Sequence, residues 1–358
     1  MGFTISDIKA VIDRAAASAG FELAGIAPAV DAPELAYFPE WIAAGRPGEM
    51  KYMEARDERG DLKRASLARV APWARSVIVC AINYNTDHPY STEFTDSASG
   101  WISRYAWSEV DYHEAVLRRL KRVETAISEA VPAPLELKTR AYVDTGPIVE
   151  RIFAKYAGIG WVGKNTCIIN QKLGSWLFLG VILSSIELPP DTPAPDRCGT
   201  CTRCIQACPT DAILAPYQLD SNKCISYLTI EKRGSIPEEL RPGMGRHLFG
   251  CDICQDVCPW NRKSPISPAP EFEARPGLVN PSLERIATME PEEFRQTFRG
   301  SAIRRAKRSG LRRNAVIAMG NSKNPDFLPL LQRLARDEDE AIAESAKSAE
   351  QRLQSQRK

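Results

Sequence analysis

The sequence contains no run of eighteen or more apolar residues, which excludes a membrane-spanning helix. Its first residues lack the basic stretch and apolar run of a secretory signal, so we expect a cytoplasmic protein with reduced cysteines. Histidine is also scarce: the chain has three, far apart in the sequence, which leaves few candidates for general acid–base chemistry. The 47 basic and 45 acidic residues nearly cancel, so the net charge of +2 says little about partners.

Cysteine, by contrast, is concentrated in one segment, because eight of the ten cysteines lie between residues 198 and 258. A first run has the spacing C-x2-C-x2-C-x3-C-P, and a later run repeats its last three positions. This is the bacterial ferredoxin signature for two 4Fe-4S clusters, in which the fourth cysteine ligates the other cluster. The chain is therefore predicted to carry electrons. The predicted ligand sets are Cys198, Cys201, Cys204 and Cys258 for one cluster, and Cys208, Cys224, Cys251 and Cys254 for the other.

Zinc is the alternative metal for the eight clustered cysteines, and the other two cysteines, Cys80 and Cys167, say less about function. Two zinc sites could also use eight cysteines, but zinc ribbons pair C-x2-C units across longer loops and have no reason to end in Cys-Pro. Cys80 lies in the apolar run SVIVCAINY and is predicted to be a core residue. Cys167, in GKNTCIIN, is either structural or faces a cofactor.

The first part of the chain, residues 1–187, alternates helical and strand patterns, which is typical of an α/β layer domain. Apolar residues at helical spacing predict helices between Ser6 and Gly20 and around residues 116–127, and a third that starts at Pro147. The segments predicted to be strands are FELAGIA, SVIVCAINY, LELKTRAYV and WLFLGVIL.

Two proline-rich linkers divide the rest of the chain. They predict an inserted ferredoxin-like domain at residues 188–268 and an all-α, HEAT-like domain at residues 269–358. The apolar positions that predict the last two helices are Phe327, Leu330, Leu331 and Leu334, followed by Ile342, Ala346, Ala349 and Leu353.

A strongly basic segment opens this helical region. It has eight basic residues and no acidic one: Arg295, Arg299, Arg304, Arg305, Lys307, Arg308, Arg312 and Arg313. The simplest interpretation is a solvated helix face. The alternative is a phosphate-binding surface, because uncompensated like charge is costly unless a polyanion neutralises it. The dominance of arginine favours phosphate recognition.

Two other motifs are ambiguous. Residues 158–165, GIGWVGKN, satisfy G-x-G-x-x-G, but they follow a helical segment and lead into the strand-like TCIIN. A dinucleotide site needs the reverse order and a P-loop needs Ser or Thr where Asn165 stands, so we predict neither. We expect these glycines to let backbone amides approach a bulky ligand. Asp144, between a predicted strand and a predicted helix, is either a helix cap or a catalytic residue.

Several segments together resemble the epoxyqueuosine reductase family, from about residue 5 to the C-terminus. They are AYVDTGPIVER, GWVGKNT, CGTCTRCIQACPTDAI, KCISYLTIE, GCDICQDVCPWN and LRRNAVIAMGN. The resemblance implies an enzyme that reduces the epoxide of epoxyqueuosine at the wobble position of tRNA, the last step of queuosine synthesis. It implies base-off cobalamin and two 4Fe-4S clusters as cofactors. Such an enzyme needs an external one-electron donor, and a tRNA-binding enzyme of this size could act as a monomer.

The resemblance also implies roles for individual residues. Asp144 would protonate the epoxide oxygen, which requires it to be partly desolvated and protonated near neutral pH. The α/β domain would hold the corrin, and no histidine has the Asp-x-His-x-x-Gly context of a lower cobalamin ligand. The basic helices would grip tRNA while the target base is splayed into the pocket. Besides Asp144, the residues implied near the corrin or the substrate are Arg64 (in a stretch that departs from the family's usual proline-containing form), Trp107, Lys164, Asn165, Ser226 and Asp252.

Two rival interpretations remain at this level. A reductive dehalogenase-like enzyme also combines cobalamin with two clusters, but it would ordinarily carry a twin-arginine export signal and no basic helical tail. An iron–sulfur electron-transfer subunit would bind neither cobalamin nor tRNA.

Overall fold

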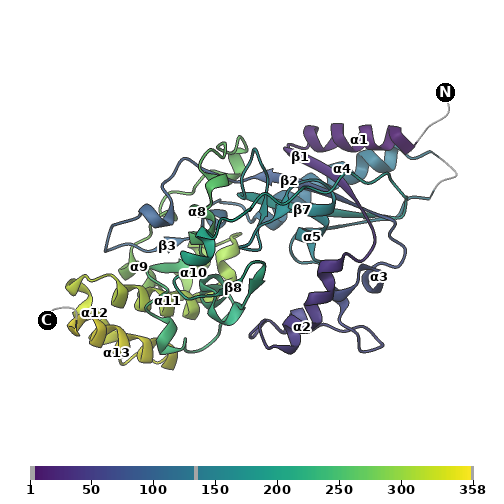
Figure 1. Ribbon diagram of the computed structural model, residues 1–358. Helices are drawn as coiled ribbons and strands as arrows, with labels where there is room; N and C mark the ends of the chain where they lie inside the picture. Colours follow the sequence, from purple (N-terminus) through teal and green to yellow (C-terminus); the bar gives the residue numbers. More distant parts are fainter. Residues whose placement is uncertain (1–4, 133–135, 356–358) are drawn as a thin grey trace.

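The computed structural model describes residues 5–132 and 136–355 (Figure 1). Four of its strands form one sheet in the order β1-β2-β7-β4, and every neighbouring pair is antiparallel. The layered domain predicted from the sequence is therefore built on an antiparallel sheet. The strands are β1 (Leu23–Pro28), β2 (Ser76–Asn83), β4 (Thr139–Tyr142) and β7 (Leu177–Ser184).

Helices cover both faces of this sheet, and the alternation along β2 shows why. Ile78 and Ile82 face a core formed with α1 (Ile5–Ser18) and α4 (Tyr112–Ala130). Val77 and Val79 face the opposite core, which contains α5 (Glu150–Tyr156). Because both faces are covered, the strand is apolar at nearly every position, and Cys80 is a core residue as predicted.

The predicted boundaries differ from the structure at one helix and one strand. The helix expected to start at Pro147 begins at Glu150, because residues 144–149 form the loop that carries Asp144. The strand expected over residues 135–143 is the shorter β4, and Leu135 lies outside the described residues. The difference matters, because it leaves the polar Asp144 in a loop instead of at a helix cap.

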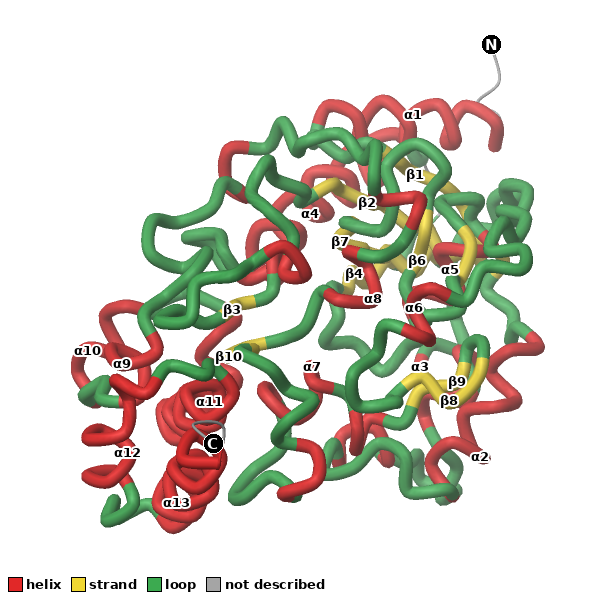
Figure 2. Tube along the Cα trace, turned by 60° about the vertical axis from the view of Figure 1, so that its left-hand side comes forward, coloured by secondary structure: helices red, strands yellow, loops and turns green. Residues whose placement is uncertain are grey.

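Short elements make up the cysteine-rich region and the segments next to it. Figure 2 shows α6, α8 and α7 between the sheet and the C-terminal helices. A parallel pairing of β10 with β3 joins this region to the N-terminal part of the chain. The bounds are α2 (Tyr37–Ala43), α3 (Leu67–Val70), β3 (Trp101–Ile102), β5 (Trp161–Val162), β6 (Ile168–Ile169), α6 (Arg203–Gln206), β8 (Ile213–Ala215), β9 (Gln218–Leu219), α7 (Ile225–Ile230), β10 (His247–Phe249) and α8 (Ile253–Asp256).

The C-terminal helices pack around the central helix α11. The predicted apolar positions of the last two helices are all buried. A Cβ on Gly320 would lie 2.7 Å from the Cβ of Ala349, so glycine is what allows α11 and α13 to approach this closely. The helices are α9 (Leu283–Ala287), α10 (Pro291–Thr297), α11 (Lys307–Asn321), α12 (Leu328–Leu334) and α13 (Glu340–Ser355).

The hydrophobic cores do not stop at the predicted domain boundaries. Trp101 and Trp107, from the N-terminal part, lie in the core of the C-terminal helices. Phe272, from beyond the second linker, packs into the core of the sheet. The division at residues 187 and 268 remains a prediction about sequence segments, while the structure packs these segments into shared cores.

One buried arginine ties α11 to the cysteine-rich region. Arg313 is 2% exposed, and its guanidinium donates hydrogen bonds to the carbonyls of Leu228, Lys232 and Gly234 over 2.9, 2.9 and 2.6 Å. The neighbouring Asn314 donates to Thr229 and Leu248. Arg313 was predicted to bind tRNA, and that prediction is wrong, because its charge is turned inward and its donors are occupied.

Replacing Arg313 should therefore destabilise the protein. Arg313→Met removes the donor from three carbonyls, of which that of Leu228 is buried, and we expect this to lower the free energy of unfolding by about 2–5 kcal/mol. The measurement is the midpoint of thermal unfolding. Arg295→Met, at an exposed position, is the matched control and should change stability by less than about 0.5 kcal/mol. Equal midpoints for the two variants would contradict the internal role of Arg313.

Candidate functional site

The first predicted cluster set is brought together in space. Burial raises the pKa of the Cys204 thiol, and the nearby Cys198 and Cys201 thiols raise it further. Burial also raises the pKa of Cys258 to about 11, with Cys198 and Cys204 adding to the effect. These four thiols are therefore mutual neighbours, although Cys258 lies more than fifty residues beyond the others in the sequence.

The second predicted set forms a separate group. Burial raises the pKa of Cys224, and the Cys208 thiol adds to it. Burial, Cys224 and Cys208 likewise raise the pKa of Cys251. The pKa of Cys254 is raised first by its contact with Cys167 and then by burial, Cys251 and Cys224. The eight cysteines thus separate into the two groups that their spacing predicts.

All ten cysteines are free thiols, as expected. Within the described parts of the chain, no three His, Cys, Asp or Glu side chains converge on a single metal ion. A cubane cluster holds its four thiolates around a core of several atoms, so its ligands lie farther apart than those of one ion. The finding that no single-ion site exists among the described residues is therefore compatible with two cubane clusters.

Lys164 and Asn165 hold the loops of both cysteine groups. Lys164 Nζ donates to the carbonyls of Gly199 and Cys201, and Asn165 Nδ2 donates to the carbonyl of Cys254. Asn165 is 5% exposed. The two residues implied to contact the corrin are therefore also the residues that fix the cluster loops.

The glycines of this motif have a different role from the one expected. A Cβ on Gly160 would lie 2.3 Å from the carbonyl oxygen of Ile169, so glycine permits the close pairing of β5 with β6. The expectation that these glycines admit a bulky ligand is wrong at Gly160, because the chain itself occupies the space.

Asp252, another implied cofactor residue, faces the protein interior. It is 1% exposed and accepts hydrogen bonds from Trp101 Nε1 at 3.1 Å, from the Arg104 amide at 2.8 Å and from Ser103 Oγ. Both carboxylate oxygens are therefore occupied. Trp107 is fully buried, and its Nε1 donates to the carbonyl of Ile102 over 2.7 Å. The prediction that Trp107 covers a ligand pocket is wrong, because it is part of the core.

Ser226 and Cys167 lie beside the second cysteine group. Ser226 is half-buried in the first turn of α7, two residues after Cys224. The thiol of Cys167 contacts that of Cys254. Of the two alternatives for Cys167, the structure favours the one in which it faces the site.

Asp144 lies in the loop between β4 and α5, with a φ of 57°. A residue other than glycine adopts this left-handed backbone at a cost of order 1 kcal/mol, and such positions cluster at functional sites. Helix α5 begins six residues later without a side-chain cap, so the helix-cap interpretation is wrong. The Asp144 amide donates to Glu150 Oε1 at 2.8 Å, and Arg64 Nη1 donates to the Gly146 carbonyl at 2.6 Å.

The Asp144 carboxylate is bound by two side chains of α4. Tyr112 Oη donates to Asp144 Oδ2 at 2.9 Å, and His113 Nε2 lies 3.6 Å from the same oxygen. His113 Nδ1 contacts Asp111 Oδ1 at 2.7 Å. The carboxylate itself is 70% exposed, so one side of this group faces open space.

These contacts set the charges of the loop. The nearby His113 lowers the pKa of Asp144 to about 2, against the opposing effect of the groups that cover the loop. Burial tends to lower the pKa of His113, but Asp111 and Asp144 raise it to about 9. Burial and the charge of Asp144 raise the pKa of Glu150 to about 8. The expectation that Asp144 is protonated near neutral pH is therefore wrong for the ligand-free protein, in which it is the anion beside an imidazolium.

Arg151 connects this loop to the cluster region. It is exposed, and its Nη1 donates to the carbonyl of Thr166 at 3.1 Å. Burial tends to lower its pKa, but the charges of Cys167, Asp144 and Glu150 raise it. Arg151 thus lies close both to the Asp144 loop and to Cys167, which contacts a cluster ligand.

Sequence reasoning missed four residues that complete the site. Tyr112 and His113 lie in a segment singled out only for Trp107, and Glu150 and Arg151 belong to the segment that drew attention to Asp144. In the sequence these residues are visible as the polar members of the runs VDYH and IVER. The distances that make them a group are visible only in the folded chain.

The eight basic residues do not form one surface. Arg312 is 11% exposed and pairs with Asp337, and Arg308 donates to the carbonyl of Met289, so both are partly engaged within the fold. Arg305 is 53% exposed and pairs with Glu231. The exposed members are Arg295, Arg299, Arg304, Arg305 and Lys307.

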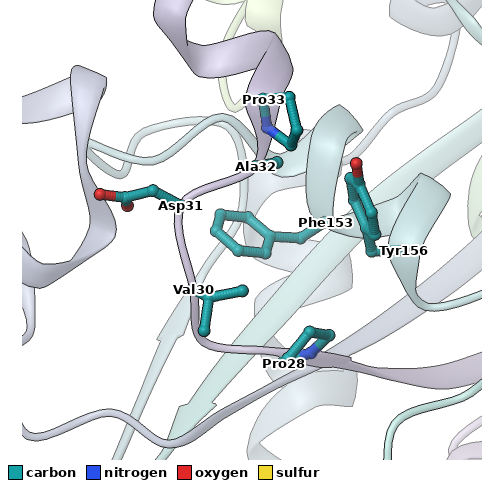
Figure 3. A pocket seen from close by; sticks show the side chains of 7 residues that line it. All are labelled: Pro28, Val30, Asp31, Ala32, Pro33, Phe153 and Tyr156. Carbon is teal, nitrogen blue, oxygen red and sulfur yellow. The ribbon is translucent and has the colours of Figure 1, made fainter.

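An apolar pocket of about 90 Å³ lies apart from the Asp144 site (Figure 3). Phe153 and Tyr156 of α5 line it together with Pro28, Val30 and neighbouring residues of the loop after β1. Its one carboxylate, Asp31, accepts a hydrogen bond from the Leu67 amide. The pocket contains neither the cysteines nor the Asp144 loop.

Within residues 5–132 and 136–355, no helix is both long enough and apolar enough to cross a membrane. This finding agrees with the absence of long apolar runs in the sequence.

Known families match two segments of the chain. Residues 64–145 match a family described as epoxyqueuosine reductase QueG, DUF1730, and residues 197–261 match a 4Fe-4S double cluster binding domain. The first match includes Arg64 and Asp144, and the second includes all eight clustered cysteines.

Whole-chain relatives agree with these matches. The chain is 46% identical to an epoxyqueuosine reductase of Synechocystis over 77% of this chain and 91% of that protein. It is 37% identical to that of Xanthomonas campestris over 95% and 94% of the two chains. A crystal structure of epoxyqueuosine reductase with an epoxyqueuosine-modified tRNA stem loop superposes with a TM-score of 0.85, at 29% identity over 98% and 91% of the chains. With the double cysteine site and the Asp144 loop in one fold, the chain belongs to the epoxyqueuosine reductase family.

Proposed function

We propose that this protein reduces the epoxide of epoxyqueuosine in the tRNA anticodon to give queuosine, with cobalamin and two 4Fe-4S clusters as cofactors. The observation that carries the proposal is the closeness of the Asp144 loop to the second cysteine group. Arg151, seven residues after Asp144, donates to the carbonyl of Thr166, the residue before Cys167, and Cys167 contacts Cys254. An acid–base group and an electron-transfer site therefore border the same region.

Residues around this region fit cobalamin bound without a histidine ligand. His113 lies between two carboxylates, His247 is buried with Nδ1 on the Met244 carbonyl, and the exposed His88 packs edge-on against Trp107. The donor set thus suits the base-off form, whose lower face is not occupied by imidazole.

The residues that would hold the cofactor lie on both sides of this region. Arg64 Nε is buried and has no hydrogen-bond partner among the described residues, which leaves a donor for a polar group of the corrin. Ser226 lies on the side of the second cysteine group, and Lys164 and Asn165 order the cluster loops there. Bound cobalamin would supply a strongly reducing centre beside the epoxide.

Electrons would enter at the first cysteine group and leave from the second. Residues 199–200 and 202–203 are exposed, so an external one-electron donor can dock beside Cys198 and Cys201. The second group lies next to Cys167 and therefore on the side of the Asp144 loop. The proposed order of the two clusters follows from these positions.

The exposed basic residues would bind the tRNA backbone, and Arg305 would bring it to the site. The Arg305 guanidinium lies 5.3 Å from the ring centroid of Tyr52, and that of Arg64 lies 5.9 Å from the same centroid. Arg64 in turn holds the Asp144 loop through Gly146. The hydrogen bond to Glu231 raises the pKa of Arg305, and the charge of Asp144 raises it further. The target base would be turned out of the anticodon stack towards Asp144.

All of these groups come from one chain, so we propose that the enzyme acts as a monomer, in the cytoplasm where tRNA is modified. The role of Asp144 is to give a proton to the epoxide oxygen as the C–O bond breaks. Removing that oxygen as water takes up two electrons and two protons. A cluster-bearing electron-transfer subunit alone would need neither Asp144 nor the exposed arginines.

Substituting Asp144 should abolish turnover but not binding. We expect Asp144→Asn to lower the rate of epoxide reduction about 10²–10⁴-fold, because the amide cannot supply the proton. The measurement is nucleoside mass spectrometry of tRNA from a deletion strain complemented with each form. Wild type should restore queuosine, and the variant should leave epoxyqueuosine, with unchanged tRNA affinity in a filter-binding control. Persistent epoxyqueuosine with the wild-type chain would contradict the proposed function.

Replacing one ligand of the second group should remove a single cluster. Cys224→Ala is expected to bind about half of the wild-type iron and sulfide after anaerobic reconstitution, since only one complete thiolate set remains. Epoxide reduction should be lost with it. Cys80→Ala, in the core of β2, is the control and should retain both clusters. Full iron content in Cys224→Ala would exclude this cysteine as a ligand.

The exposed arginines should account for part of the salt dependence of tRNA binding. Removing Arg299 and Arg304 together should weaken binding and reduce the slope of log affinity against log salt by about 0.7–0.9 for each phosphate that is no longer neutralised. The comparison is the single variant Arg308→Ala, whose side chain donates to the Met289 carbonyl and should change the slope less. Equal slopes in wild type and in the double variant would contradict the proposed surface.

A further inference from the structure

A chain of three side chains leads from the start of α4 to Asp144. Asp111 Oδ1 lies 2.7 Å from His113 Nδ1, and His113 Nε2 lies 3.6 Å from Asp144 Oδ2. Asp111 also caps α4 by accepting the amide of His113 at 3.0 Å. The imidazole is thereby fixed at one nitrogen, and its other nitrogen faces the carboxylate.

The charged and titratable groups around His113 come from three elements. Asp111 and Tyr112 belong to α4 and its cap, Asp144 to the loop after β4, and Glu150 and Arg151 to α5. The imidazole packs against the Tyr112 ring with centroids 4.0 Å apart. The two carboxylates that face the imidazole, Asp111 and Asp144, favour the imidazolium.

The other neighbours of Asp144 are less suited to supply it with a proton. Tyr112 donates a hydrogen bond to the carboxylate, but burial and the charge of Asp144 raise the pKa of its phenol well above the ordinary value. Glu150 accepts the backbone amide of Asp144, so it faces the main chain instead of the carboxylate. His113 is the neighbour that both faces Asp144 Oδ2 and holds a proton near neutral pH.

We propose that His113, oriented by Asp111, is the positioning residue that delivers protons to Asp144 during epoxide reduction. This inference rests on the proposed function. His113 Nε2–H gives its proton to Asp144 Oδ2, and Asp144 gives it to the epoxide oxygen as the first C–O bond breaks. His113 is reprotonated from solvent and repeats the transfer as the second C–O bond breaks and a C=C bond forms. The oxygen then leaves as water, with two protons from this relay and two electrons from the external donor by way of the clusters.

Ligand binding sets the direction of this transfer. In the ligand-free protein the Asp144 carboxylate is 70% exposed and the His113 side chain is 31% exposed, so water stabilises the ion pair. Covering the pair removes that water and disfavours both charges. Moving the proton from His113 to Asp144 makes both side chains neutral. Asp144 is then protonated, and can act as an acid, when a substrate is bound.

Kinetics with chemical rescue test the relay in the holoenzyme with saturating reductant. His113→Ala should lower kcat about 10²-fold with an unchanged Kd for tRNA, and added imidazole should restore part of the rate. Wild type at the same imidazole concentrations controls for binding of imidazole elsewhere. Glu114→Gln is the matched variant, because Glu114 is exposed on the same turn and has no side-chain hydrogen bond in the described part of the chain.

The pH profile adds a second readout. Wild-type kcat/KM should fall as pH rises through about 9, because His113 then loses the proton that it delivers. His113→Ala should lack this alkaline limb. An unchanged kcat and an unchanged alkaline limb in His113→Ala would overturn the relay, while a wild-type enzyme that fails to reduce epoxyqueuosine would overturn the proposed function instead.

A readout without turnover is the titration of His113 by NMR in the holoprotein. The chain has three histidines, so labelled imidazole signals can be assigned with single substitutions. We expect His113 to titrate near pH 9 in wild type and at a lower pH in Asp111→Asn, which should also have a reduced kcat. Titration of wild-type His113 near its ordinary value of 6.5 would overturn the proposal.

Discussion

The buried carboxylate of Asp252 is the contact on which the arrangement of the site depends. It lies between the cluster ligands Cys251 and Cys254 and accepts hydrogen bonds from the segment around Trp101 and Arg104. Trp101 is part of the core of the C-terminal helices. One carboxylate therefore fixes the second cluster loop to the core of the helical region, and a charge buried this deeply is tolerated only because all its acceptor positions are used.

Arg104 extends this anchoring to the loop before β3. Its guanidinium donates to the carbonyls of Thr86, His88 and Pro89, and it packs against Trp107 and Trp176. Lys164 and Asn165 act in the same way on the opposite side, where they bind carbonyls of both cluster loops. The cysteine-rich segment, which has little regular structure of its own, is thus held by side chains from the parts of the chain that surround it.

In the proposed reaction, electrons and protons would approach Asp144 from different elements of the fold. Arg151 binds the carbonyl of Thr166, next to Cys167 and the second cysteine group, whereas Asp111 and His113 belong to the start of α4. Between them the Asp144 loop is held in a left-handed conformation by Glu150 and Arg64. Two separate routes would let the loop accept protons from a polar helix end while electrons arrive from the cysteine groups.

The sequence by itself predicted the two cysteine groups and determined most helices and strands. Cysteines three and four residues apart can be gathered only on a short turn, and apolar residues at helical spacing must share a face, so both signals are local. It also singled out Asp144. It could not tell that Arg313 and Trp107 are internal, or that His113 lies against Asp144, which is 31 residues away. Burial and side-chain contact depend on which distant segments the cores bring together, and only the tertiary structure decides that.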